Sequence, residues 1–205
     1  MIHIVDDEEP IRDALAWLLR SRELPCRAHA SAEDFLAWLA AGGEDPASPA
    51  VVLLDVRMGG LSGIDLFERL RSEERIPAWP VVFLTGHGDV PMAVDALKLG
   101  AFDFVEKPFN DNSLVDRLLA ALDESRRRLE EAHVAARRDQ GLATLTARER
   151  EVLDLVIEGH YNKVIADRLG IAMRTVEVYR ARIFGKMGVK SAVELARMFA
   201  GRDEP

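Results

Sequence analysis

From Met1 to about Leu122, short apolar runs alternate with amphipathic stretches, which predicts repeated strand–helix units. The run at residues 51–54 is apolar at every position, which is typical of a central strand covered by helices on both faces. We therefore predict an α/β domain with a parallel sheet. The predicted strands are residues 2–5, 26–29, 51–54, 81–84 and 102–105, and the predicted helices lie near 10–20, 32–40, 64–72, 90–99 and from 112 onward.

The fifth predicted helix has no stop signal before Gly141. Its apolar positions 115, 118, 122, 129, 132 and 136 recur at intervals of three, four and seven residues. This spacing fits a partial coiled-coil seam, and it fits a solvated helical spacer equally well. We predict a domain over residues 1–122 and a linker over residues 123–142 that continues the fifth helix.

The chain after Gly141 has a helical pattern throughout. Thr146 and Glu149 have the spacing of a capping box, and Asn162 is a candidate cap for a second helix. Residues 169–171 form a short connection with a central glycine, which is typical of a helix-turn-helix. We predict an all-α domain over residues 143–205, with helices at 147–158, 163–169, 174–187 and 192–200.

Charge is divided unevenly between these two parts. The chain has a net charge of −8, yet residues 143–205 carry 11 Lys and Arg against 9 Asp and Glu, a net charge of +2, which leaves −10 for residues 1–142. Such an asymmetry favours two modules with different partners.

Composition favours a cytoplasmic globular protein that does not contact a membrane. No apolar run approaches the roughly 18 residues that span a bilayer, and residues 6–9 are all acidic where a signal peptide needs positive charge. Cys26 is the only cysteine, which excludes an intramolecular disulfide and a thiolate metal cluster.

Polar side chains follow four of the predicted strands, where parallel strands share one edge of the sheet. Asp6 and Asp7 follow the first strand, Asp55 the third, Thr85 the fourth and Lys107 the fifth. Converging carboxylates repel one another unless a cation neutralises them, and hard oxygen ligands favour Mg²⁺ or Mn²⁺. Mg²⁺ also tolerates phosphate oxygens beside one or two carboxylates, so we predict that Asp55 accepts a phosphoryl group.

These residues lie in segments that resemble the receiver domain of two-component response regulators. The segments are the pair Asp6 and Asp7, DVRMGGLSG around Asp55, TGHGDVPMAV from Thr85 and EKPF around Lys107. The resemblance covers about residues 1–122, and it implies a flavodoxin-like fold with strand order 2-1-3-4-5.

The resemblance also implies a role for each matched position. It implies a phosphoryl group transferred from a sensor histidine kinase to Asp55, and Mg²⁺, or Mn²⁺ in its place. The implied metal ligands are Asp7, Asp55 and the Arg57 carbonyl, with Asp6 acting through water. Lys107, before an implied cis Pro108, pairs with the phosphoryl group; Thr85 and Phe104 form a switch pair; and Arg57 and His87 tune dephosphorylation.

The loop after Asp55 departs from the family pattern. It reads RMGG where relatives generally read RMPG, so that Gly59 stands in place of proline. Because glycine widens the accessible backbone conformations, we expect a modestly looser loop and no loss of chemistry.

Residues 174–187 predict a helix with one buried stripe and one basic face. Apolar Val176, Ile183 and Met187 have core-facing spacing. A helix of this length fits a DNA major groove, where basic side chains hold phosphates. The basic side chains of the helix are Arg174, Arg180, Arg182 and Lys186.

This region resembles the LuxR-type helix-turn-helix of FixJ-like and NarL-like regulators. The resemblance rests on LTARERE and on NKVIADRLGIAMRTVEVYRARIFGKMGVKS, within residues 143–200. Ala172 stands where relatives commonly have a Ser cap, and Tyr179 where they often have His. The implied base-reading positions are Glu177, Val178 and Ala181, and the implied phosphate contacts are Asn162, Lys163, Thr175, Arg182, Lys186 and Lys190.

The two resemblances together favour a transcription factor controlled by phosphorylation of Asp55. They imply a sensor histidine kinase, double-stranded promoter DNA and a second copy of the chain as partners, with dimerisation on phosphorylation. Two alternatives stay open: a phosphorylation-gated protein-binding module, and a magnesium-dependent phosphohydrolase with Asp55 as nucleophile. Arg57 counts against the hydrolase, because that position would have to supply a general acid.

Overall fold

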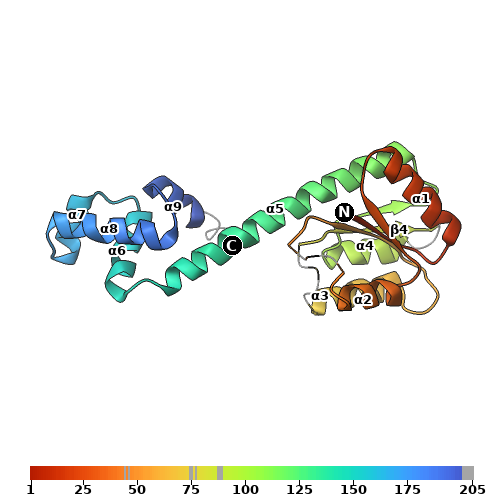
Figure 1. Cartoon of the computed structure of the whole chain (residues 1–205), viewed down its shortest axis with the longest axis horizontal. Coiled ribbons are helices and arrows are strands. Elements are labelled where there is room, and N and C mark those ends of the chain that lie inside the picture. Colours follow the sequence, from red (N-terminus) through yellow and green to blue (C-terminus); the bar gives the residue numbers. More distant parts are fainter. Residues whose placement is uncertain (44, 46, 74–75, 77, 87–89, 200–205) are drawn as a thin grey trace. The chain divides into compact units, whose positions relative to one another are not determined.

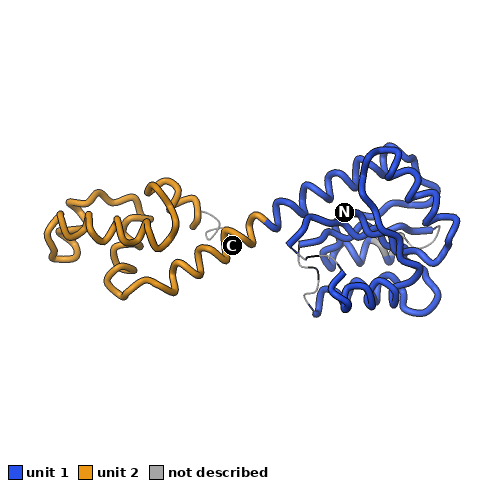
Figure 2. The backbone as a smooth tube through the Cα atoms, viewed as in Figure 1, with its two compact units in different colours: residues 1–129 blue, residues 130–205 orange. Residues whose placement is uncertain are grey.

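The computed structural model describes residues 1–43, 45, 47–73, 76, 78–86 and 90–199. The chain forms two compact units, residues 1–129 and residues 130–205 (Figure 2). Among the described residues, no helix combines the length and the apolar character needed to cross a membrane.

The first unit is built on a five-stranded parallel sheet with the order β2-β1-β3-β4-β5. The predicted fold and strand order are therefore confirmed. Three strands end one residue later than predicted, because the ladder continues through the pairs Asp55 with Leu84 and Thr85 with Glu106. The strands are β1 (Ile2–Val5), β2 (Cys26–His29), β3 (Val51–Asp55), β4 (Val81–Thr85) and β5 (Asp103–Glu106).

Helices cover both faces of this sheet (Figure 1). Side chains of α1 and α5 pack with Ile2 and Ile4 on one face, and side chains of α2, α3 and α4 pack with Val5 and Val52 on the other. All five residues of β3 are buried, and the first four are the apolar run that predicted a strand covered on both faces. The helices are α1 (Glu9–Ser21), α2 (Ala32–Ala40), α3 (Gly63–Ser72), α4 (Val90–Lys98) and α5 (Asp111–Ala143).

The predicted continuation of the fifth helix is present, since α5 is one helix of 33 residues. The boundary between the two compact units falls within it, after Leu129. Residues 130–134 are exposed to solvent. The choice between a coiled-coil seam and a solvated spacer stays a prediction.

In the described part of the second unit, up to residue 199, four further helices surround a separate apolar core. The capping box of Thr146 and Glu149 is present, and Gly170 makes the turn between α7 and α8 with a φ of 64°. Asn162 does not cap α7: Tyr161 occupies the cap position, and Asn162 is the first helical residue. The helices are α6 (Ala147–Ile157), α7 (Asn162–Leu169), α8 (Met173–Met187) and α9 (Ala192–Phe199).

Candidate functional site

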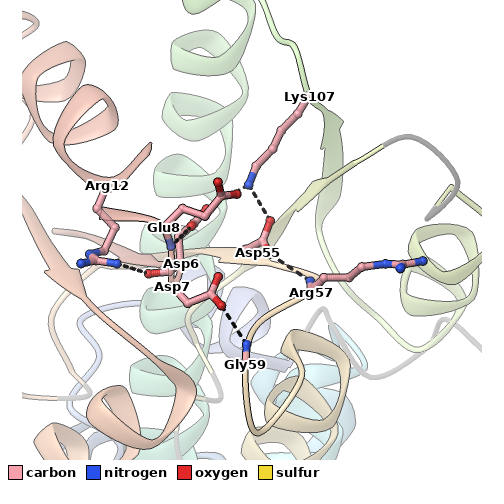
Figure 3. A network of polar contacts seen from close by, with 8 residues as sticks. All are labelled: Asp6, Asp7, Glu8, Arg12, Asp55, Arg57, Gly59 and Lys107. Atoms are coloured by element: carbon pink, nitrogen blue, oxygen red, sulfur yellow. Dashed lines mark hydrogen bonds and ion pairs between the residues drawn. The ribbon is translucent and has the colours of Figure 1, made fainter. Parts of the chain in front are cut away.

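Two carboxylates and one ammonium group meet at the carboxyl edge of the sheet (Figure 3). Lys107 Nζ donates to Asp55 Oδ1 at 2.7 Å and to Asp6 Oδ2 at 3.0 Å. Both aspartates are buried, and the Lys107 side chain is only 18% exposed. The convergence expected from the strand ends is therefore found for Asp6, Asp55 and Lys107.

Strand register explains this convergence. Val5 is paired with Leu54 in the parallel ladder, so Asp6 and Asp55 follow from neighbouring positions. The Lys107 backbone N–H donates to the Thr85 carbonyl at 2.7 Å, and the implied cis peptide bond to Pro108 is present. These contacts tie the lysine to the end of β4.

Gly63 allows α3 to begin directly beside Asp55. A Cβ on this glycine would lie 2.0 Å from the Asp55 carbonyl oxygen, so no side chain fits there. The Gly63 N–H donates to the Val56 carbonyl at 3.0 Å. Gly63, the last glycine of the DVRMGGLSG segment, thus has a packing reason in this fold.

The protonation of Asp55 and Lys107 is shaped by burial and by their ion pair. Burial raises the pKa of Asp55, although hydrogen bonding and charge from Lys107 act in the opposite direction. Burial alone would lower the pKa of Lys107, but its bonds to Asp55 and Asp6 outweigh that effect and raise it. Lys107 is therefore held as a cation beside a carboxylate that burial disfavours as an anion.

The loop after β3 is held by acidic side chains from other elements. The Gly59 N–H donates to Asp7 Oδ2 at 2.8 Å, and the Leu61 N–H donates to Glu33 Oε1 at 3.0 Å. Proline has no N–H, so the bond to Asp7 requires a residue other than proline at position 59. Gly59 therefore contributes a donor to the site, which the expectation of a looser loop had missed.

Asp6 and Arg57 also use backbone contacts that residue types alone do not reveal. The Glu8 N–H donates to Asp6 Oδ1 at 2.9 Å, and the Arg12 side chain donates to the Asp6 carbonyl at 2.8 Å. The Arg57 N–H donates to Asp55 Oδ2 at 2.9 Å, whereas its side chain extends away from Asp55 (Figure 3).

The residues of the predicted switch lie on neighbouring strands. Thr85 is fully buried, and within the described part of the chain its hydroxyl has no hydrogen-bond partner. Phe104 is half-buried on β5 and packs against the core on the α2–α4 face. His87, predicted to tune dephosphorylation, lies outside the described residues.

The donor chemistry of the edge suits a hard divalent cation. Asp6, Asp7 and Asp55 supply carboxylate oxygens, and two of them already converge on one positive charge. Among the described residues, His, Cys, Asp and Glu side chains form no ready-made group of three that could hold a metal ion, and Asp7 is directed at Gly59. The residue types fit Mg²⁺, while the Asp7 side chain points elsewhere.

In the second unit, α8 has one buried stripe and one exposed face, as predicted. Val176, Ile183 and Met187 are buried in the core. The predicted DNA contacts exposed on the opposite face include Arg174, Glu177, Val178, Ala181 and Arg182. No side chain caps the amino end of α8 at Ala172, in keeping with the missing Ser.

The remaining predicted contacts differ in their surroundings. Lys163 and Lys190 are exposed, and Asn162 and Thr175 are partly exposed. Arg180 lies over the Phe184 ring, 5.4 Å from its centroid. Lys186 is exposed as well, with 33% of its side chain accessible, yet its ammonium donates within the unit to Glu149 Oε2 at 2.6 Å and to the Thr144 carbonyl at 2.9 Å.

Comparison with known proteins agrees with this architecture. Residues 2–119 match the family described as "Response regulator receiver domain", and residues 143–199 match "Bacterial regulatory proteins, luxR family". The class defined by the fold and by these matches is that of DNA-binding transcriptional regulators. The chain belongs to the two-component response regulators that combine a receiver domain with a LuxR-type helix-turn-helix.

Individual relatives match over nearly the whole length. The C4-dicarboxylate transport transcriptional regulatory protein DctR of Rhodobacter capsulatus is 52% identical, with 96% of this chain and 98% of DctR covered. FixJ of Rhizobium meliloti is 42% identical, with 96% and 93% covered. The structure of the response regulator StyR has a TM-score of 0.77 at 36% identity, with 98% of each chain covered. Full-length FixJ from B. japonicum has a TM-score of 0.60 at 39% identity, with 97% and 95% covered.

Proposed function

We propose that a sensor histidine kinase phosphorylates Asp55, and that phosphorylation makes the protein dimerise and bind promoter DNA. The observation that carries this proposal is the shared ammonium of Lys107, which lies 2.7 Å from Asp55 and 3.0 Å from Asp6. A buried carboxylate with a cation already beside it is suited to receive a phosphoryl group, because the cation remains to pair with the new negative charge.

In the proposed reaction, an Asp55 carboxylate oxygen attacks the phosphorus of a phosphohistidine. A P–O bond forms, the P–N bond breaks, and the histidine nitrogen leaves with the bonding electron pair. Lys107 turns from carboxylate to phosphoryl oxygen as charge shifts. We propose that Asp6, Asp7, Asp55 and the Arg57 carbonyl hold Mg²⁺, which would neutralise phosphoryl oxygens when bound. Asp7 would then exchange its contact with Gly59 for the metal.

We further propose that Thr85 and Phe104 carry the change to the surface. The Thr85 hydroxyl is buried, and a phosphoryl oxygen on Asp55 would give it an acceptor. Phe104 would follow the threonine inward and alter the surface of α4, β5 and α5. Moving such an equilibrium from 1:99 to 99:1 requires about 5.5 kcal/mol of differential binding.

The test compares the wild-type chain with Asp55→Asn, with and without acetyl phosphate and Mg²⁺. We expect phosphorylation, a doubling of the mass in solution and tighter retention of DNA in the wild type alone. Equal behaviour of the two proteins would remove phosphorylation from the mechanism. If no salt-dependent retention of DNA is found, the protein-binding alternative is favoured, and continuous turnover of small phosphate esters would favour a hydrolase.

A further inference from the structure

The end of the linker helix is bound to the carboxyl end of α8 within the second unit. Lys186, near the end of α8, donates to the Thr144 carbonyl just after the linker. Arg137 of the linker donates to the carbonyl of Gly188, the residue that caps α8, at 3.3 Å. The Arg150 side chain of α6 donates to the Leu142 carbonyl at 2.7 Å. These three bonds join residues 137–144 to two helices of the DNA-binding fold.

Close packing supports the same junction. A Cβ on Gly141 would lie 2.6 Å from Met187 Sδ and 3.3 Å from Met187 Cα, so the helix approaches α8 through a glycine. Leu145 is buried, and Leu142 packs against the core of this unit. The last turns of the linker are therefore part of that core.

Lys186 has a buried acidic partner in this junction. Glu149 is only 3% exposed, and its Oε2 accepts from the Thr146 N–H, from the Thr146 hydroxyl and from Lys186 Nζ. The bond from Lys186, followed by that from the Thr146 backbone, lowers the pKa of Glu149 to about 2. A buried carboxylate that loses its counterion is strongly disfavoured, so moving the Lys186 ammonium away from Glu149 would cost free energy.

We infer that Lys186 is a positioning residue: it fixes the carboxyl end of α8 to Glu149 and to the linker end, and does not neutralise a DNA phosphate. The DNA-binding module accordingly starts near Arg137, inside α5, and includes the end of the linker predicted for residues 123–142. Arg137, Gly141 and Lys186 hold the linker end and the recognition helix as one piece. This inference concerns the DNA-binding domain and does not depend on phosphorylation of Asp55.

The salt dependence of DNA binding separates a positioning lysine from a phosphate contact. Each lost phosphate contact lowers the slope of log K against log salt by about 0.9. We would measure binding of the full chain to a mixed-sequence duplex of about 30 base pairs, at a temperature where every variant is folded by circular dichroism. Lys190→Met, which removes an exposed lysine, is the matched control and should lower both the affinity and the slope.

For Lys186→Met we expect a several-fold loss of affinity with an unchanged slope, and a lower unfolding temperature of the second unit. A purely structural lysine would leave the affinity of the folded protein unchanged. Lys186→Arg, which retains the charge, should recover most of the affinity.

The partner variant Glu149→Gln keeps the inference testable if Lys186→Met folds poorly. Glutamine removes the buried charge that needs Lys186, so the stability lost through Lys186→Met should fall by at least half in the Glu149→Gln background. A slope that drops by about 0.9 for Lys186→Met in either background would overturn the inference. Equal stability losses in both backgrounds would overturn it as well.

Discussion

Each unit of the molecule contains a buried carboxylate paired with one lysine, and the two carboxylates differ in how they are held. Asp55 contacts Lys107 at 2.7 Å in the receiver, and Glu149 contacts Lys186 at 2.6 Å in the DNA-binding unit. Burial raises the pKa of Asp55, whereas hydrogen bonds from Lys186 and Thr146 lower the pKa of Glu149 to about 2.

The two carboxylates differ in how many hydrogen bonds they accept and in whether their lysine is shared with a second carboxylate. Glu149 Oε2 accepts two bonds from Thr146 within its capping box and a third from Lys186 of α8, so this carboxylate holds α6 and α8 together. Asp55 accepts one side-chain bond and one backbone bond, and its lysine is shared with Asp6. The pair of Asp55 and Lys107 can therefore rearrange around an added phosphoryl group. The pair of Glu149 and Lys186 stabilises a single arrangement.

The largest expected effect is on phosphorylation itself. Asp55→Asn should abolish phosphoryl uptake from acetyl phosphate, because the amide is a poor nucleophile. Glu149→Gln, the matched change in the other unit, should leave uptake at the wild-type level. Intact-protein mass spectrometry measures both. Phosphorylation of Asp55→Asn at the wild-type level would show that another residue is the acceptor.

The second prediction concerns the shared lysine. Lys107→Met leaves Asp6 and Asp55 facing each other without a cation, so we expect a loss of about 3 to 5 kcal/mol in the free energy of unfolding of the receiver at neutral pH. The repulsion adds to the burial that already raises the pKa of Asp55, so the difference from wild type should shrink as the pH falls and Asp55 takes up a proton.

Tryptophan fluorescence during urea unfolding measures this loss, because all three tryptophans, at positions 17, 38 and 79, lie in the receiver. Lys98→Met is the control: Lys98 pairs with Asp95 on the surface, and exposed pairs contribute at most about 1 kcal/mol. Equal losses for the two variants would show that Lys107 is no more than a surface charge.

The third prediction sets the two units against each other in pH dependence. His3 and His29 are buried in the receiver with ring nitrogens 3.3 Å apart, among Phe35, Trp38 and Trp79. Burial, with the charge of its partner His29, lowers the pKa of His3 to about 3, and burial lowers the pKa of His29 to about 4. Below about pH 6.5 these histidines bind protons in the unfolded chain but not in the folded receiver. The receiver therefore becomes less stable as the pH is lowered.

At pH 5 the loss should be roughly 2 kcal/mol for each histidine. In the DNA-binding unit, the stabilisation from Glu149 is lost only as the pH falls from about 4.5 toward 2. The tryptophan-monitored unfolding temperature should therefore drop between pH 6.5 and 5, whereas the transition of the helical unit, followed by circular dichroism, should hold. His29→Gln should halve the pH dependence of receiver stability. A wild-type unfolding temperature that does not change between pH 6.5 and 5 would contradict the lowered pKa values of the two histidines.

Much of the fold follows from the apolar pattern, because a run such as residues 51–54 has no polar side chain that could face solvent. The meeting of Asp6, Asp55 and Lys107 also follows, since parallel strands end at one edge. Backbone donors such as the Gly59 N–H could not be predicted, because every residue except proline has one and only the loop's path decides which is used.

The long-range ion pair within the second unit could not be predicted from the sequence either. Lys186 has the spacing of a surface cation on α8, and its partner Glu149 lies 37 residues earlier in another helix. A carboxylate in a capping box is an ordinary surface feature in the sequence. Only the packing of α6 against α8 makes it buried and gives it a lysine.

The smallest predicted effect tests the junction between the linker and α8 with two glycines in equivalent places. Gly141 and Gly185 each stand two residues before the last residue of a helix, α5 and α8 respectively. A Cβ on Gly185 would meet nothing within 4 Å, whereas a Cβ on Gly141 would lie 2.6 Å from Met187 Sδ. Alanine is preferred over glycine in a helix by up to about 1 kcal/mol.

Gly185→Ala should therefore raise the free energy of unfolding of the DNA-binding unit by about 0.5 to 1 kcal/mol. Gly141→Ala should lower the free energy of unfolding. The new Cβ would clash with Met187, and the energetic cost of moving the helix away exceeds the gain in helix propensity. Urea unfolding followed by circular dichroism measures both changes in the full chain, with the tryptophan transition of the receiver as internal reference. Equal gains for the two variants would mean that the linker end does not rest on α8.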